Sequence, residues 1–521
     1  MSQVAKILGR NPKEQERCLL VLVYLFLGLA FVRLWLLHPE ESLLVFAGSF
    51  LVIILSTGVA HFWIRQVAPD TDPFLLPLTA CLSSLSLIML RRLAPGLLWK
   101  QTLWLGIGTA IMLSVALVPQ DLRWLRRYRY TWLGLGLLLL ALTLFLGVNP
   151  LGRGARLWFG MAGVYFQPSE LLKVVFVVFL ASYLAEKSQL IRLSFSRIGR
   201  LRIPPLPYLV PLLLVWGVAM ALLAAQQDLG AGTLLFGTFL AMLYVSTRKI
   251  YYVATGLVLM GLGGLLARSV SQFVDLRIDV WLNPWAQPRG GGYQIIQALL
   301  SFAAGGISGT GLGLGYGATY IPVAHTDFVF AIIGEELGLC GALAVLILYL
   351  FLFYRGLRIA LLARSSFERL LAIGLSFGLA LQAWVIAAGN LKLAPLTGVT
   401  LPWISYGGSS LTAGYIAIGL LLQVSSHSSY SRPVHYSPHA VDGSAFAPAE
   451  PMVMNRSLIH VLAVVLLCFS LLAAGLLYWQ VISSKELLIR TDNPRLYDQK
   501  PNTSQGQLPD PREVILTQGR Q

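Results

Sequence analysis

The feature that most constrains the fold of this chain is a series of apolar stretches, each about twenty residues long. A helix of that length crosses the hydrocarbon core of a bilayer, and irregular backbone cannot face lipid. The sequence therefore predicts an all-α polytopic membrane protein with about 12 transmembrane helices and one additional C-terminal transmembrane helix. The predicted spans lie near 18–37, 43–64, 74–90, 96–117, 131–148, 168–186, 207–225, 229–247, 251–268, 326–354, 368–388, 408–424 and 458–480.

The composition argues against a large water-soluble core. Of the 521 residues, 56% are hydrophobic and only 12% are charged, whereas soluble domains carry about 25% charged residues. The net charge of +16 does not indicate nucleic acid as a partner, because the basic residues cluster in short loops between apolar stretches. That placement is typical of loops on the cytoplasmic side of a membrane, with lipid as the surrounding medium.

The distribution of basic residues predicts an orientation and a set of segments. Arginine and lysine are concentrated in 118–130, 187–206 and 355–367, which all become cytoplasmic if the N-terminus, 1–17, is cytoplasmic. Arg91, Arg92 and Lys100 oppose this pattern. The C-terminus and the long loop 269–325, which we expect to be packed with short helices over a cavity, are then external. Residues 426–457, rich in Ser, Pro and His, read as a flexible cytoplasmic linker.

Polar residues gather at the predicted outer ends of several helices. Ionisable groups near a membrane are costly, so they are functional candidates. The four groups are Arg153, Arg156, Trp158, Gln167, Ser169, Glu170 and Lys173; Asp228; His325, Asp327 and Glu335; and Ser405, Gly407, Gly408 and Ser409. Each has a structural alternative: an ion pair between Glu170 and Lys173, a helix cap at Asp228, or close packing through small residues near 405–410.

These polar groups predict a crevice that opens outward and accepts an amphiphilic substrate. The tail of such a substrate would lie in lipid and its headgroup outside. Motifs of soluble enzymes do not compete with this interpretation, because the sequence has no phosphate loop, zinc-protease pair or dinucleotide fingerprint.

Five segments resemble blocks of the SEDS family, which includes FtsW, RodA and SpoVE-like proteins. They are GARLWFGMAGVYFQPSELLK (154–173), QDLGAGTLL (227–235), GGYQIIQALLSFAAGGISGTGLGLG (291–315), YIPVAHTDFVFAIIGEELGLCGA (320–342) and LTGVTLPWISYGGSSL (396–411). The resemblance covers most of 150–425 and is looser before it. It implies a SEDS-type transmembrane domain over 18–425 in a bacterial cytoplasmic membrane. It further implies a peptidoglycan glycosyltransferase that polymerises lipid II during division or elongation, with a class B penicillin-binding protein and other division or elongation proteins as partners.

The chemistry implied by this resemblance needs a carboxylate base and cations. The base deprotonates the acceptor hydroxyl, and the cations stabilise the departing undecaprenyl pyrophosphate. The family places an aspartate where this chain has Gln287, so Asp279 and Asp275 are the candidate substitutes, and a binding role for Gln287 stays open. Further candidates for substrate binding are Arg277, Arg289, Tyr293 and Gln294. The sequence requires no cofactor and shows no metal-ligand set, although Mg²⁺ or Mn²⁺ bridging a pyrophosphate stays open.

Two alternatives accompany the polymerase. A non-catalytic scaffold that activates a penicillin-binding protein is favoured by Gln287, and a lipid II flippase would need a polar path through the bundle. Residues 454–521 resemble the start of a class B penicillin-binding protein, with an anchor helix at 458–480 and an external stem at 481–521. The Ser-x-Asn and Lys-Thr-Gly motifs of a transpeptidase are absent from the sequence. An extra helix with an ordered tail is the simpler alternative.

Overall fold

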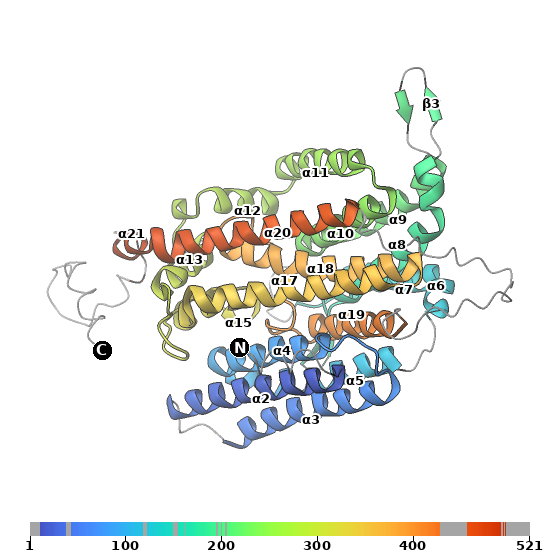
Figure 1. Ribbon diagram of the computed structural model, residues 1–521. Helices are drawn as coiled ribbons and strands as arrows, with labels where there is room; N and C mark the ends of the chain where they lie inside the picture. The colour runs from blue at the N-terminus through green and yellow to red at the C-terminus, as the bar shows by residue number, and fades with distance from the viewer. Residues whose placement is uncertain are drawn as a thin grey trace.

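The computed structural model describes residues 11–37, 43–117, 122–149, 155–161, 163–193, 196–198, 201–203, 206–427, 456–490, 493 and 495. Within this part of the chain, 13 helices are long and apolar enough to cross a membrane, which confirms the predicted fold class. They form one bundle (Figure 1). They are α2 (Pro12–Leu37), α3 (Leu43–Val67), α4 (Leu75–Leu93), α5 (Pro95–Leu117), α7 (Arg129–Leu146), α8 (Pro168–Leu193), α9 (Leu206–Ala225), α10 (Leu229–Thr247), α11 (Ile250–Val270), α17 (Gly338–Leu362), α18 (Ser366–Asn390), α19 (Gly408–His427) and α20 (Arg456–Leu477).

Shorter elements connect these helices. One end of the bundle, where α8, α10 and α19 begin and α18 ends, is called the site end here. It carries α12 (Gln272–Leu282), η1 (Pro284–Ala286), α13 (Tyr293–Gly305), α14 (Gly317–Tyr320), α15 (Ala324–Asp327), α16 (Val329–Glu336), η2 (Tyr478–Ile482), α21 (Ser484–Ile489) and the hairpin of β1 (Phe159–Met161) with β2 (Val164–Phe166). The opposite end carries α6 (Arg123–Arg127) and the hairpin of β3 (Ser196–Ile198) with β4 (Leu201–Ile203), which projects from the bundle in Figure 1.

Burial separates a central group of helices from a peripheral one. In α4, α8, α10, α18 and α19, between 72% and 89% of the most apolar stretch is buried, against 11% in α11. Small residues allow close approach in the centre, because a Cβ atom on Gly408 would lie 2.3 Å from the Trp104 ring. The close packing expected near 405–410 is therefore confirmed at Gly408.

The prediction of one span over 326–354 is wrong at its start. Residues 324–336 instead form the short helices α15 and α16, and the spanning helix α17 begins at Gly338. Gly338 has a φ of +66°, and a Cβ atom there would lie 2.3 Å from the backbone nitrogen of Gly309. The chain therefore turns sharply at Gly338, because the glycine loop approaches it too closely for a side chain.

The glycine-rich stretch 309–317 encloses two buried carboxylates. The backbone N–H of Gly317 donates to Oε2 of Glu335 over 2.9 Å, and that of Gly313 donates to Oε2 of Glu336 over 2.8 Å. Arg92 adds an ion pair of 3.1 Å between its Nε and Oε1 of Glu336. Two buried acids thus obtain the donors that burial requires. Arg92, which does not follow the predicted cytoplasmic distribution of basic loop residues, is held by its ion pair with Glu336.

Replacing Gly317 with alanine is expected to destabilise the protein by about 1–3 kcal/mol, the usual cost of overpacking. The added Cβ atom would lie 2.1 Å from Oε2 of Glu335 and 2.4 Å from Oγ of Ser301. The measurement is the thermal unfolding midpoint in detergent. Gly261→Ala on α11 is the control, because no atom lies within 4 Å of its Cβ position. Equal midpoints for the two variants would contradict the enclosed-carboxylate interpretation.

Candidate functional site

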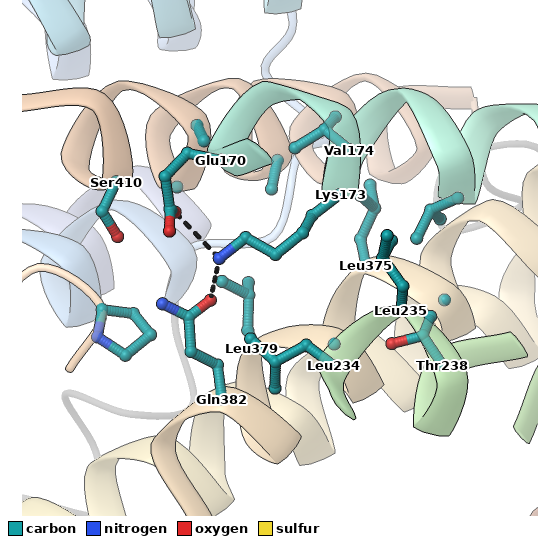
Figure 2. Close-up of a pocket in the computed structure, with 17 residues that line it drawn as sticks. Glu170, Lys173, Val174, Leu234, Leu235, Thr238, Leu375, Leu379, Gln382 and Ser410 are labelled. Carbon is teal, nitrogen blue, oxygen red and sulfur yellow. Dashed lines mark hydrogen bonds and ion pairs between the residues drawn. The ribbon is translucent and has the colours of Figure 1, made fainter. Parts of the chain in front are cut away.

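A pocket that is partly open to its surroundings lies among α8, α10, α18 and α19. Its lining is polar where the helices reach the site end and mostly apolar deeper in the bundle (Figure 2). The polar group comprises Glu170, Lys173, Gln382 and Ser410. The remaining lining residues are Val174, Val177, Leu234, Leu235, Thr238, Gly374, Leu375, Gly378, Leu379, Pro402, Ala413, Gly414 and Ala417. The arrangement suits a molecule with a polar head and an apolar chain. The residues of 269–325 do not line this pocket.

Lys173 is the cation at the polar end of the pocket. Its Nζ lies 2.8 Å from Oε2 of Glu170 and donates to Oε1 of Gln382 over 2.8 Å (Figure 2). The ion pair expected from the spacing of these two residues is confirmed. The Lys173 side chain is 15% exposed, so its charge is shielded from water but still reachable. A phosphate entering the pocket would meet this ammonium group.

A second carboxylate adjoins the first pair. Asp228 caps α10, since its Oδ1 accepts from the backbone N–H of Ala231 over 2.9 Å. Its Oδ2 accepts from the hydroxyl of Ser169 over 3.0 Å. Burial raises the pKa of Asp228, and these two hydrogen bonds oppose the rise. The cap expected at Asp228 is thus confirmed, and the aspartate also joins the N-terminus of α8 to that of α10.

Ser409 links this group to α19. Its Oγ accepts from the backbone N–H of Gln167 over 2.9 Å, so the start of α19 is tied to the residue before α8. The side chain of Gln167 donates to Ser169 over 3.0 Å. Three of the four polar groups predicted from the sequence therefore meet around the N-termini of α8, α10 and α19.

Asp327 and Arg277 form the next part of the site. A Cβ atom on Gly398 would lie 3.9 Å from Oδ2 of Asp327 and 4.0 Å from Nη2 of Arg277, so both groups flank this glycine. Arg277 donates to the carbonyl oxygen of Leu396 over 3.0 Å, and the side chain of Asn390 donates to the carbonyl oxygen of Asp327 over 2.9 Å. α12, α15 and α18 thus hold this pair in place.

The electrostatic environment of Asp327 differs from that of an exposed aspartate. Burial raises its pKa to about 6, and the positive charge of Arg277 limits the rise. Burial also lowers the pKa of Arg277, while the negative charges of Asp327 and Asp228 oppose this change. Arg277 therefore lies close enough to both carboxylates to interact with them electrostatically. From Lys173 to Asp327, positively charged side chains alternate with acidic ones along the site.

His325 and Ser405 brace the loop before α19. The backbone N–H of Tyr406 donates to the carbonyl oxygen of His325 over 2.9 Å. Ser405 accepts from the backbone N–H of Leu401 over 2.9 Å and donates to the carbonyl oxygen of Thr326. Burial lowers the pKa of His325, which favours its neutral form. Gly407 lies in the same loop, directly before α19.

The residues proposed as substitute bases lie on another side of α12. Nε and Nη2 of Arg268 contact Oδ1 of Asp275 at 2.9 Å and Oδ1 of Asp279 at 2.8 Å. Residues four apart share a helix face, whereas Arg277, two residues from each, lies on the opposite face. Gln287 follows η1 and is exposed. These three residues therefore lie apart from the Lys173 pocket.

The remaining predicted residues are placed as follows. Glu335 is fully buried within the glycine loop, away from the pocket lining. Arg289 is exposed, and Tyr293 and Gln294 begin α13 and are half-buried. Arg156 is exposed, and the backbone of Trp158 pairs with that of Val148. Arg153 lies outside the described residues.

Sequence reasoning missed Gln382 and Thr400. The amide of Gln382 donates to the carbonyl oxygen of Thr400 over 2.8 Å, and the hydroxyl of Thr400 donates to Oγ of Ser410 over 2.8 Å. These hydrogen bonds orient Oε1 of Gln382 toward Lys173. A single glutamine in the apolar stretch 368–388 was the signal that could have identified it.

Comparisons with known proteins agree with this geometry. The family of FtsW, RodA and SpoVE, described as cell cycle proteins, matches residues 73–430. A peptidoglycan glycosyltransferase RodA from Mycobacterium tuberculosis is 40% identical over 386 residues, covering 71% of this chain and 81% of the relative. Stage V sporulation protein E of Bacillus subtilis is 36% identical over 341 residues, covering 64% of this chain and 87% of the relative.

Solved structures show the same fold. One describes structural coordination of polymerization and crosslinking by a peptidoglycan synthase complex; it is 31% identical, with a TM-score of 0.56, and covers 68% of this chain and 97% of that chain. A mutant of the rod shape determining protein RodA from Thermus thermophilus is 28% identical with a TM-score of 0.50. The match covers 68% of this chain and 97% of that chain. The matched residues include every helix around the pocket. The chain belongs to the SEDS family of membrane proteins, together with FtsW, RodA and SpoVE.

Proposed function

We propose that this protein is a peptidoglycan glycosyltransferase that polymerises lipid II into glycan strands. The observation that carries the proposal is the pocket with Lys173 at its polar end and an apolar interior, in a chain 40% identical to a RodA glycosyltransferase. Lipid II has the matching chemistry, since its pyrophosphate joins a sugar headgroup to a long isoprenoid chain. The pyrophosphate would lie at Lys173 and the first part of the chain in the apolar interior.

The reaction needs one proton acceptor and positive charge on the leaving group. A carboxylate removes the proton from the acceptor hydroxyl, whose oxygen then bonds to the anomeric carbon of the donor sugar. The bond from that carbon to undecaprenyl pyrophosphate breaks, and the leaving group departs as an anion. Lys173 and Arg277 are the cations of the site that would stabilise it. Within the described residues there is no cluster of three metal-ligating side chains, so a bridging Mg²⁺ or Mn²⁺ would be held chiefly by the pyrophosphate.

Gln287 cannot accept a proton near neutral pH, so another residue must act as the base. Substitution of the candidate carboxylates can identify it. Asp327 flanks Arg277 in the site, and burial raises its pKa to about 6, close to the value that suits a general base. Asp275 and Asp279 pair with Arg268 instead. We place the base at Asp327, with Asp275 and Asp279 as the alternatives that the experiments below compare.

The partner of the polymerase is inferred from two features. One of the similar solved structures is that of a peptidoglycan synthase complex, which coordinates polymerization and crosslinking. Residues 454–521 resemble the anchor and stem of a class B penicillin-binding protein, and α20 lies along the bundle. We infer that a class B penicillin-binding protein supplies the crosslinking activity.

The site end is assigned to the external side, because Arg123, Arg126 and Arg127 lie at the opposite end.

Purified protein with lipid II and a separate class B penicillin-binding protein is expected to form glycan strands, with moenomycin present to silence contaminating enzymes. The measurement is strand length on a gel, with Gln287→Asp run alongside. Strands from Gln287→Asp but not from the parent would identify a decayed polymerase that acts as a scaffold. Transfer of labelled lipid II across liposomes without any strands would identify a flippase.

A further inference from the structure

Residues 456–490, called the C-terminal segment here, lie against the bundle of their own chain. α20 packs along α17, α18 and α10, and α21 packs on α13 (Figure 1). At the site end, Trp479 donates from Nε1 to the carbonyl oxygen of Leu391 over 2.9 Å. Gln480 and Ser484 donate to the carbonyl oxygens of Gly334 and Ala303 over 2.8 and 2.7 Å. These bonds reach residues more than 80 positions away in sequence, so the segment is joined specifically to the site end.

Arg495 inserts a positive charge into the interior of this end. It is 8% exposed. Its Nε donates to Oε1 of Gln297 over 2.7 Å, and its Nη2 donates to Oγ of Ser301 over 2.8 Å. Its Nη1 lies 3.4 Å from Oε1 of Glu335, which is fully buried. A buried guanidinium requires such partners, and its planar fork allows it to hold several at once.

The same segment supports the loop that contains Gln287. Leu487 is buried in an apolar cluster with Ile296 and Leu299 of α13, and Trp285 packs against this cluster. The guanidinium carbon of Arg490 lies 4.1 Å from the centre of the Trp285 ring. Trp285 is two residues from Gln287. The C-terminal segment therefore contacts both the Gln287 loop and the helix that follows it.

We propose that residues 478–490, together with Asn493 and Arg495, are a built-in positioning segment for the site, with Arg495 as its principal positioning residue. Arg495 joins α13, through Gln297 and Ser301, to α16, through Glu335. α16 begins two residues after Asp327, so a fixed α16 also fixes Asp327 beside Arg277. The family match ends at residue 430, so this support lies outside the matched region. The inference rests on the proposed polymerase and adds a determinant of its geometry.

A docking experiment tests the first half of the proposal without any catalysis. A protease site is inserted between α19 and α20 of the full-length protein, and the cleaved C-terminal fragment is followed during purification in detergent. The fragment from the parent is expected to stay with the bundle. Arg495→Met should weaken its retention on the order of 100-fold, because Glu335 loses the charge that compensates its burial. Lys485→Met, an exposed position on α21, is the matched control. Equal retention of all three fragments would overturn the proposal.

A kinetic experiment tests the second half in the uncleaved protein. Arg495→Met is expected to lower kcat by about 10–100-fold while KM changes little, because a displacement near 1 Å in a site has effects of this size. Arg495→Lys should be intermediate, since one ammonium cannot replace the fork. Lys485→Met should match the parent. A parent-like kcat for Arg495→Met, or a loss that simply follows the fraction of unfolded protein, would refute positioning.

Hydrogen–deuterium exchange separates this inference from the polymerase itself. Arg495→Met is expected to speed amide exchange over 313–336, which includes Asp327 and α16, and Lys485→Met should not. The result does not depend on strand formation. If the parent forms no strands but Arg495→Met changes exchange, the polymerase fails and the positioning segment stands. Unchanged exchange would overturn the positioning segment even in an active protein.

Discussion

Replacing Lys173 with methionine is expected to lower the rate of glycan-strand formation by about 10²–10³-fold, the range found when one group that stabilises developing charge is removed. Methionine keeps most of the volume of the side chain but cannot stabilise an anion. The pyrophosphate would then leave from a pocket whose polar end holds Glu170, Gln382 and Ser410 without the ammonium group. The measurement is kcat for lipid II consumption at saturating substrate.

Two further variants make this result specific. Lys187→Met is the matched control, because Lys187 lies on the same helix, α8, and its Nζ is 2.9 Å from Oε1 of Glu186, but it lies at the opposite end of the bundle. Its rate should equal that of the parent. Lys173→Met combined with Glu170→Gln removes the unpaired buried acid, so it should recover stability without recovering the rate. A parent-like rate for Lys173→Met would place the pyrophosphate elsewhere.

Replacing Asp327 with asparagine is expected to reduce the rate by about 10²–10⁴-fold, the usual contribution of a general base. Only the ionised carboxylate can accept the proton of the acceptor hydroxyl, and burial raises the pKa of Asp327 to about 6. The rate of the parent should therefore rise as the pH increases through about 6 and level off above it. The residual rate of Asp327→Asn should lack this rise. The measurement is the pH profile of kcat/KM.

The same shift has a defined effect on stability. Because the pKa of Asp327 is raised in the folded state, the folded protein binds this proton more tightly than the unfolded chain does. The resulting stabilisation is fully present below the ordinary aspartate value of about 4 and is lost as the pH rises through about 6. The unfolding midpoint of the parent relative to Asp327→Asn should therefore fall over this range.

Asp275→Asn and Asp279→Asn are the comparison for both measurements. Both residues contact Arg268 on the face of α12 opposite Arg277. We expect each variant to keep the rate and the pH profile of the parent. Loss of the pH-dependent rise in either variant, with the rise retained in Asp327→Asn, would move the base to α12.

Local sequence patterns were sufficient for the spans and for short-range pairs. The length of each apolar stretch determines whether a helix crosses a membrane, and 13 were correctly expected. The spacing of Glu170 and Lys173 places them on one helix face, and the ion pair of 2.8 Å follows from it. Asp228 directly precedes a helix, where its side chain caps the first turn. These features depend on neighbours in sequence, so sequence alone was sufficient to predict the spans and to name the ion pair and the cap as structural alternatives.

Tertiary structure alone decided which distant groups meet. Hydropathy predicted one span over 326–354. It does not detect that the carboxylates of Glu335 and Glu336 need hydrogen-bond donors from the backbone of the loop 309–317. Likewise, the sequence does not show that Arg277 approaches Asp327 while Asp275 and Asp279 pair with Arg268. Arg495 reaches Glu335 across 160 positions. The physical reason is that buried charges select partners by proximity in the packed bundle, and periodicity along the chain does not encode that proximity.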